Sequence, residues 1–144
     1  MSAVALALLV MSGVRAADRS AATPVGLWRT FSDTDGHESG QVEIVERDGM
    51  LVGRVTGIAD PLKRDAVCQK CSDNRRGEKV LGLEIIRQMK HDGTRWDGGE
   101  ILDPETGDTY RCSMRLEADG KVLVVRGFIG LAMFGRSQRW LRLE

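Results

Sequence analysis

Short runs of alternating polar and apolar residues, separated by turn sequences, fill most of the chain and predict an all-β fold. In residues 40–47 the apolar positions include Val42 and Ile44, and Asp48-Gly49 then leads into the run of residues 50–58. Asp-Gly between two alternating runs is a strong hairpin signal. The predicted strands are residues 25–32, 40–47, 50–58, 81–89, 94–102, 108–117, 121–130 and 135–143.

About eight strands at regular spacing are typical of a β-barrel or a sandwich. Tight turns join most successive strands, which favours a small antiparallel up-and-down barrel over a Greek key with its long crossovers. Eight tilted strands can close around a small interior and leave no unpaired edge. Residues 83–89 could instead be helical, because Leu83, Ile86 and Met89 also fit a helical period. The connection formed by residues 59–80 is long, and such segments are usually functional or restrained by other contacts.

The first 16 residues predict a secretory signal peptide. Residues 3–11 are all apolar and too few to span a bilayer, and small residues follow, with Val14 and Ala16 placed for cleavage. A short buried helix is the alternative. We therefore expect residues 17–144 to form a single mature domain that is periplasmic or secreted, with no transmembrane segment.

The charges of the chain balance, with 21 Lys and Arg against 21 Asp and Glu in 144 residues. Nucleic acids and anionic membranes attract proteins that carry an excess of basic residues on one face. Neither is therefore an expected partner. A hydrophobic content of 42% is ordinary for a globular domain.

Three cysteines in an exported protein suggest one disulfide and one remaining thiol. Cys112 shares a strand face with Tyr110 and Met114, and this face is expected to be buried. We therefore predict a disulfide between Cys68 and Cys71, which would staple the long connection.

A redox motif and a zinc site are alternative interpretations of the two loop cysteines. A thioredoxin-like motif requires its first cysteine at a helix N-terminus, whereas the flanks of this Cys-x-x-Cys are loop-like. Zinc usually requires four ligands, and only His37 and His91 could complete the set. Acidic clusters at residues 33–35 and 103–108 lack the ligand spacing of a calcium loop and suit turns instead. No metal or cofactor is predicted.

The sequence carries no Gly-x-Ser-x-Gly nucleophile, no phosphate-binding loop and no dinucleotide fingerprint. Its two histidines, each beside a turn residue, are poor candidates for a general base. We therefore expect a protein that is not an enzyme.

Arg126 interrupts the apolar run of residues 122–129. If the barrel interior takes the face of Val124 and Phe128, Arg126 points inward and can pair with a ligand carboxylate. Arg126, Phe128 and Trp140 are therefore the candidate ligand-binding residues. As alternatives, Arg126 faces solvent or pairs with an internal acid such as Glu84 or Glu100.

Motifs at the two ends of the domain resemble those of the lipocalin superfamily. Gly26-Leu27-Trp28 begins the first predicted strand, and Trp140-Leu141-Arg142 lies in the last. In lipocalins, a Gly-x-Trp on the first strand packs under an arginine from the last strand and seals the barrel end. The resemblance implies this closure role for Gly26, Trp28 and Arg142, and a guanidinium on an indole contributes about 0.5–2 kcal/mol.

A second resemblance covers most of the predicted mature chain. Its segments, in order, are PVGLW at 24–28, GLEII at 82–86, DGGEILDPETG at 97–107, VRGFIG at 125–130 and GRSQRWLR at 135–142. Together they resemble the bacterial secreted family catalogued as domain of unknown function 2147. This implies a small lipocalin-like barrel behind a signal peptide, and brings no activity with it.

Two functions follow from this fold. A barrel of this size can hold one small apolar or amphipathic ligand, here expected to bear a carboxylate. Alternatively, the core is packed solid and the protein is a structural or interaction module of the cell envelope that works through residues 59–80. The volume of the interior distinguishes the two.

Overall fold

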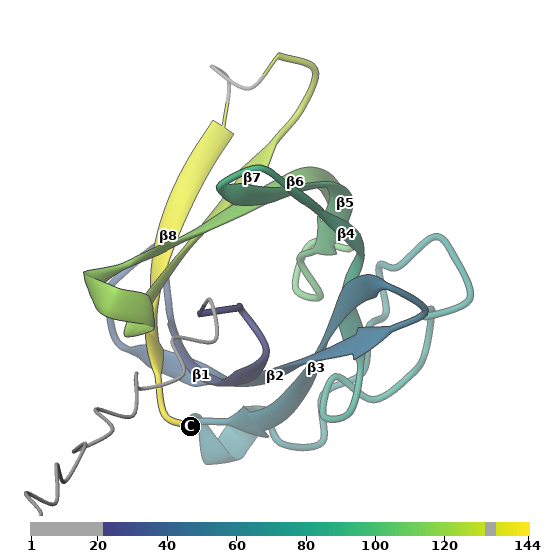
Figure 1. Cartoon of the computed structure of the whole chain (residues 1–144). Helices are drawn as coiled ribbons and strands as arrows, with labels where there is room; N and C mark the ends of the chain where they lie inside the picture. The colour runs from purple at the N-terminus through teal and green to yellow at the C-terminus, as the bar shows by residue number, and fades with distance from the viewer. Residues whose placement is uncertain (1–21, 132–134) are drawn as a thin grey trace, which may run out of the picture.

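Eight antiparallel strands form a closed barrel in the computed structural model, which describes residues 22–131 and 135–144 (Figure 1). Each strand pairs with its neighbours in chain order, and β8 returns to β1 through the pairs Trp28–Arg142 and Arg29–Leu141. The predicted all-β, up-and-down barrel is confirmed. The predicted signal peptide lies outside the described residues. The strands are β1 (Gly26–Phe31), β2 (Glu38–Arg47), β3 (Met50–Ile58), β4 (Glu84–Asp92), β5 (Arg95–Leu102), β6 (Thr109–Glu117), β7 (Val122–Phe128) and β8 (Gly135–Arg142).

The predicted turn between β2 and β3 lies at Asp48-Gly49. Both residues have left-handed backbone angles, with φ of 55° and 77°. Two such residues in succession make the type I′ turn whose twist matches that of the strands it joins. The adjacent pairing of Arg47 with Met50 then sets the register of the hairpin.

The alternative helix at residues 83–89 is not formed. Residues from Glu84 onward belong to β4, which pairs with β3 and β5. Ile86 pairs with Gly53 of β3 on one side and with Ile101 of β5 on the other. The helix-like spacing arises from an irregularity at Gln88, whose φ is 58°. This kink lets Ile86 and Met89, three positions apart, both become fully buried, whereas a regular strand would turn them to opposite faces.

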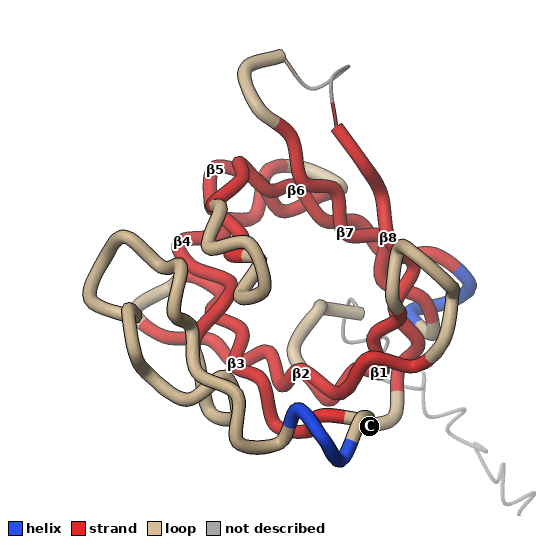
Figure 2. The backbone as a smooth tube through the Cα atoms, turned by 180° about the vertical axis from the view of Figure 1, so that it is seen from behind, coloured by secondary structure: helices blue, strands red, loops and turns tan. Residues whose placement is uncertain are grey.

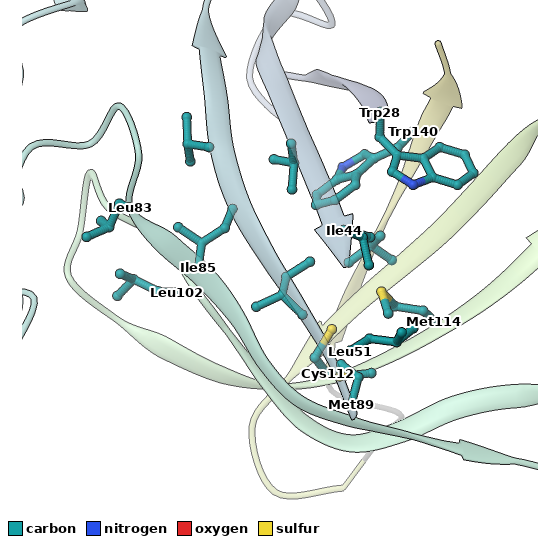
Figure 3. Packing of buried hydrophobic residues seen from close by; sticks show 14 of the residues in the cluster. Trp28, Ile44, Leu51, Leu83, Ile85, Met89, Leu102, Cys112, Met114 and Trp140 are labelled. Atoms are coloured by element: carbon teal, nitrogen blue, oxygen red, sulfur yellow. The ribbon is translucent and has the colours of Figure 1, made fainter. Parts of the chain in front are cut away.

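Apolar side chains fill one end of the barrel. Trp28 and Trp140 are the largest fully buried residues, and Figure 3 shows them with Ile44, Leu51 and Met114 gathered inside the strands. Burial of such side chains is the main favourable term in the folding of a domain like this one.

The long connection between β3 and β4 is folded against the barrel, and Figure 2 shows it in tan beside these two strands. It contains the short 3-10 helix η1 (Pro61–Lys63) and an isolated bridge between Val67 and Lys79. The predicted disulfide between Cys68 and Cys71 is confirmed, with the Cα atoms 5.5 Å apart. The third cysteine, Cys112, is free and buried, and burial raises the pKa of its thiol to about 12.

A buried arginine fixes the middle of this connection. Arg75 is only 2% exposed, and its guanidinium donates to both carboxylate oxygens of Asp73 and to the backbone oxygen of Glu84. The carboxylate of Glu100 on β5 lies 3.6 Å from the same guanidinium. Arg75 therefore links the connection to the outer surface of β4 and β5.

The double substitution Cys68→Ser/Cys71→Ser should leave the barrel folded and lower the free energy of unfolding by about 1–2 kcal/mol, because the disulfide closes a very short loop. Residues 59–80 should become easier to cleave, since they lose one restraint. Denaturant unfolding and limited proteolysis with peptide mapping check both effects. Loss of the barrel signal in circular dichroism would contradict the view that the disulfide only staples the connection.

Candidate ligand-binding cavity

One end of the barrel is sealed around Trp28. The guanidinium of Arg142 lies over the Trp28 indole, 4.3 Å from the ring centroid, and the indole nitrogen donates to the backbone oxygen of Pro24 at 2.7 Å. Arg142 also donates to the backbone oxygens of Gly120, Val25 and Thr23. These bonds join β8, the β6–β7 turn and the segment before β1 into a cap.

Glycine is required at position 26 of this cap. Gly26 has a φ of 144°, and a Cβ atom there would overlap the backbone oxygen of Glu144 and approach the Arg142 guanidinium within 2.6 Å. The geometry expected for Gly26, Trp28 and Arg142 is therefore present.

The opposite half of the barrel is hollow. A cavity of about 1290 Å³ opens between the connections β1–β2, β3–β4, β5–β6 and β7–β8. Sites for small organic ligands usually measure roughly 300–1000 Å³, so the space is ample for one such molecule. Ile44, Leu51, Met89 and Met114 do not border the cavity and form the packed half beyond it.

The wall of the cavity is made of uncharged strand residues. Gly127 leaves space on this wall, because the atoms nearest to a Cβ at this position, the Tyr110 Cβ at 3.4 Å and the Ile101 Cγ2 at 3.5 Å, are at ordinary contact distance. We call the following residues the wall: Val42, Val55, Ile85, Ile101, Tyr110, Val125, Gly127, Gln138 and Trp140.

Trp140 places a polar group on this wall. Its indole nitrogen donates to the side-chain oxygen of Gln138 at 2.9 Å. Both residues point inward, because they lie opposite Leu123 and Val125, which belong to the buried core. A second polar pair borders the cavity on the neighbouring strands β1 and β2, where the hydroxyls of Thr30 and Ser39 are 2.8 Å apart.

Charged residues gather around the mouth. Arg136 lies 3.4 Å from the Asp33 carboxylate, and Lys63 lies 2.9 Å from that of Glu105, which raises the pKa of Lys63. We call the charged lining residues the rim: the acids Asp33, Asp35, Glu38, Asp60, Asp103 and Glu105, and the cations Lys63, Lys70 and Arg136.

The prediction that Arg126 points into the barrel is wrong. Leu123 and Val125 belong to the buried core, so Arg126 faces the other way and donates to the hydroxyl of Ser137. Alternation could not decide the face, because β7 is apolar on both sides and Val124 is also buried. The outward orientation, one of the two alternatives, is the one observed, and Arg126 lies opposite Ser113 and Ser137 on the outer face of the sheet.

Of the other two candidate binding residues, Trp140 lines the cavity on the wall. Phe128 borders the cavity at the end of β7, but it stands outside the main core cluster. Its ring lies 5.5 Å from the guanidinium of Arg111, the residue opposite it on β6. Gln138, Gly127 and Tyr110 were not among the candidates. The positions of Gln138 and Tyr110 could have been found by counting two residues from Trp140 and from Cys112. Gly127 lies opposite Cys112 on the neighbouring strand, which only the strand register shows.

The cysteines and histidines do not form a metal site in the described structure. Cys68 and Cys71 are bonded to each other, and His91 packs against Trp96 with the ring centroids 4.9 Å apart. Across residues 22–131 and 135–144, no three side chains of the usual ligand types lie close enough to hold a metal ion. In the same ranges, no helix has the length and hydrophobicity needed to cross a membrane.

Residues 26–142 match the model of a family described as "Uncharacterized protein conserved in bacteria (DUF2147)". The chain belongs to this family. The predicted resemblance to it is therefore confirmed, and the match extends from the first residue of β1 to the last residue of β8. No curated protein matches the chain.

A solved structure has the same fold. It is described as protein HP1028 from the human pathogen Helicobacter pylori, a member of the lipocalin family. The two chains superpose with a TM-score of 0.73 at 17% identity, over 83% of this DUF2147 chain and 82% of the other. At this identity the similarity shows a shared lipocalin-like fold and no more.

Proposed function

We propose that this DUF2147 protein is a non-enzymatic binding protein that takes one small apolar or amphipathic molecule into the open half of its barrel. The observation that carries the proposal is the cavity of about 1290 Å³ with its uncharged wall. Apolar surface on both ligand and wall would leave water on binding, which is the main driving force for sites of this kind.

The rival function, a packed envelope module, would need side chains to fill the barrel throughout. Here they fill only the sealed half. The long connection, which the rival function would use as its working surface, contributes Lys63 and Lys70 to the rim. Both features favour the binding function.

We further propose that the protein works outside the cytoplasm. Disulfides persist in oxidising compartments such as the periplasm and the extracellular space, and are rare in reducing ones. The Cys68–Cys71 bond supports this compartment, in agreement with the signal peptide expected from residues 1–16.

Substitution of Gly127 by leucine tests the proposal. The new side chain would project from the wall past Tyr110 and Ile101 into the cavity. We expect the affinity for the uncharged fluorescent probe N-phenyl-1-naphthylamine to fall roughly tenfold or more, because the space that it needs is filled. Gly127→Ala, which adds only one methyl group, should give a smaller loss. Probe fluorescence during titration measures both.

Ser137→Leu is the matched control. Ser137 lies on the neighbouring strand beside Arg126 and faces away from the core, so its leucine should leave probe affinity unchanged. Circular dichroism and denaturant unfolding establish that each variant is folded. No probe binding by the unsubstituted protein, or equal binding by folded Gly127→Leu, would refute a ligand site inside the barrel.

A further inference from the structure

The charged residues that line the cavity lie at its mouth, and the residues of the wall deeper inside are uncharged. Among the described residues that line it, charged side chains come only from the connections between strands, from the first residue of β2, Glu38, and from the second residue of β8, Arg136. Deeper in the cavity, every strand residue of the wall is uncharged. A ligand that enters therefore passes a charged rim and then meets neutral surface.

The rim carries more negative than positive charge, with six carboxylates against three cations. Two of the cations, Arg136 and Lys63, already face the carboxylates of Asp33 and Glu105. A ligand carboxylate at the mouth would meet repulsion and would compete with these acids. The cation nearest the wall is Arg136, opposite Gly127, but its side chain is 67% exposed and lies 3.4 Å from the Asp33 carboxylate. Further inside, a ligand carboxylate would lose water without a cation to replace it, which is costly.

Gln138 is a wall residue that can donate a hydrogen bond to a ligand. An indole N–H can only donate, so the Gln138 atom 2.9 Å from the Trp140 indole nitrogen is the amide oxygen. This bond uses one lone pair of the amide oxygen and orients the side chain, while the NH₂ group keeps its two N–H donors for a ligand. This group donates and cannot accept, so it suits an ester, hydroxyl or carbonyl oxygen.

We infer that the ligand is an uncharged amphiphile, with an apolar chain against the wall and a neutral oxygen-bearing group that accepts a hydrogen bond from Gln138. This inference rests on the proposed binding function and names its ligand class. It replaces the carboxylate-bearing ligand that an inward Arg126 would have required.

Displacement of bound N-phenyl-1-naphthylamine tests the ligand class. Monolaurin and laurate share one acyl chain and differ in the head group. At about pH 8, where a carboxylic acid is ionised, and below the micelle concentration of each, we expect monolaurin to displace the probe at a concentration roughly tenfold lower. Added salt should narrow the difference, because it screens the repulsion between laurate and the rim. Equal or better displacement by laurate would overturn the inference.

Gln138→Leu tests the hydrogen bond. The probe has no oxygen to accept it, so in this variant the affinity for monolaurin should fall roughly fivefold relative to the affinity for the probe. Ser137→Leu, on the opposite face of the same strand, should change neither. Unchanged monolaurin affinity in Gln138→Leu would refute the role of Gln138. Failure of the probe itself to bind would instead refute the proposed function, so the two failures are distinguishable.

Discussion

Replacing Trp28 with alanine should lower the free energy of unfolding by about 3–5 kcal/mol, the range found when a large aromatic residue is removed from a core. Trp28 is fully buried, and its indole nitrogen donates to the backbone oxygen of Pro24 at 2.7 Å. The substitution also removes the ring beneath the Arg142 guanidinium, which then loses its cation–π contact. Packing, a hydrogen bond and a charge contact are thus lost together.

Urea unfolding followed by circular dichroism measures the loss of stability. Two further variants show which lost contacts cause it. Trp96→Ala should cost less, because Trp96 is only partly buried at the edge of the core, where it packs against His91. Trp28→Phe should cost less than Trp28→Ala, since it keeps most of the apolar contact and loses the N–H donor. If Trp96→Ala were the more destabilising change, the sealed end of the barrel would not be the part on which stability depends.

Most of the strand order could be predicted because a half-buried strand alternates at a period of two and its turns have sequence requirements. The Asp48-Gly49 turn is an example, with both residues in the left-handed conformation. Local rules failed where the backbone is irregular or where both faces are apolar. At β4 the kink at Gln88 imitates a helical period, and only pairing with two distant strands determines the outcome.

The candidate site was predicted in part, for the same reason. Trp140 borders the cavity, and its role in binding stays a prediction. Arg126 was assigned to the wrong face because Leu123, Val124 and Val125 are all buried and give no alternation to follow. The rim could be predicted only in part. The predicted up-and-down topology places its four connections at one end of the barrel, but no local pattern shows which of their charged side chains border the opening.

Asp73→Ala should lower the free energy of unfolding by about 2–3 kcal/mol. Arg75 is only 3% exposed in its side chain, and without Asp73 its charge would stay buried with the more distant Glu100 as its remaining acidic partner. Breaking a fully buried pair costs about 3–5 kcal/mol. The smaller value is expected here because Asp73 is 40% exposed and solvent screens part of the interaction.

Arg75→Met is the informative comparison. It removes the buried charge together with the need for a partner and keeps a long apolar side chain, so it should destabilise less than Asp73→Ala. Urea unfolding of the two variants at neutral pH decides the order. A greater loss in Arg75→Met would mean that the bond from Arg75 to the Glu84 backbone oxygen, 3.0 Å long, matters more than the ion pair.

The ion pair of Asp73 and Arg75 should also make the free energy of unfolding depend on pH in the acid range. Hydrogen bonds from Arg75 lower the pKa of Asp73 to about 2, from an ordinary value of 3.8. A carboxyl group whose pKa is lower in the folded state stabilises the fold above its unfolded pKa and loses that contribution as the pH falls toward its folded pKa. The urea concentration at the unfolding midpoint of the unsubstituted protein should therefore decrease as the pH is lowered from about 4 to about 2. In Asp73→Ala the same decrease should be smaller. An equal slope in both proteins would place the acid sensitivity in other carboxylates, of which Glu84, with its pKa lowered by Arg47, is the next candidate.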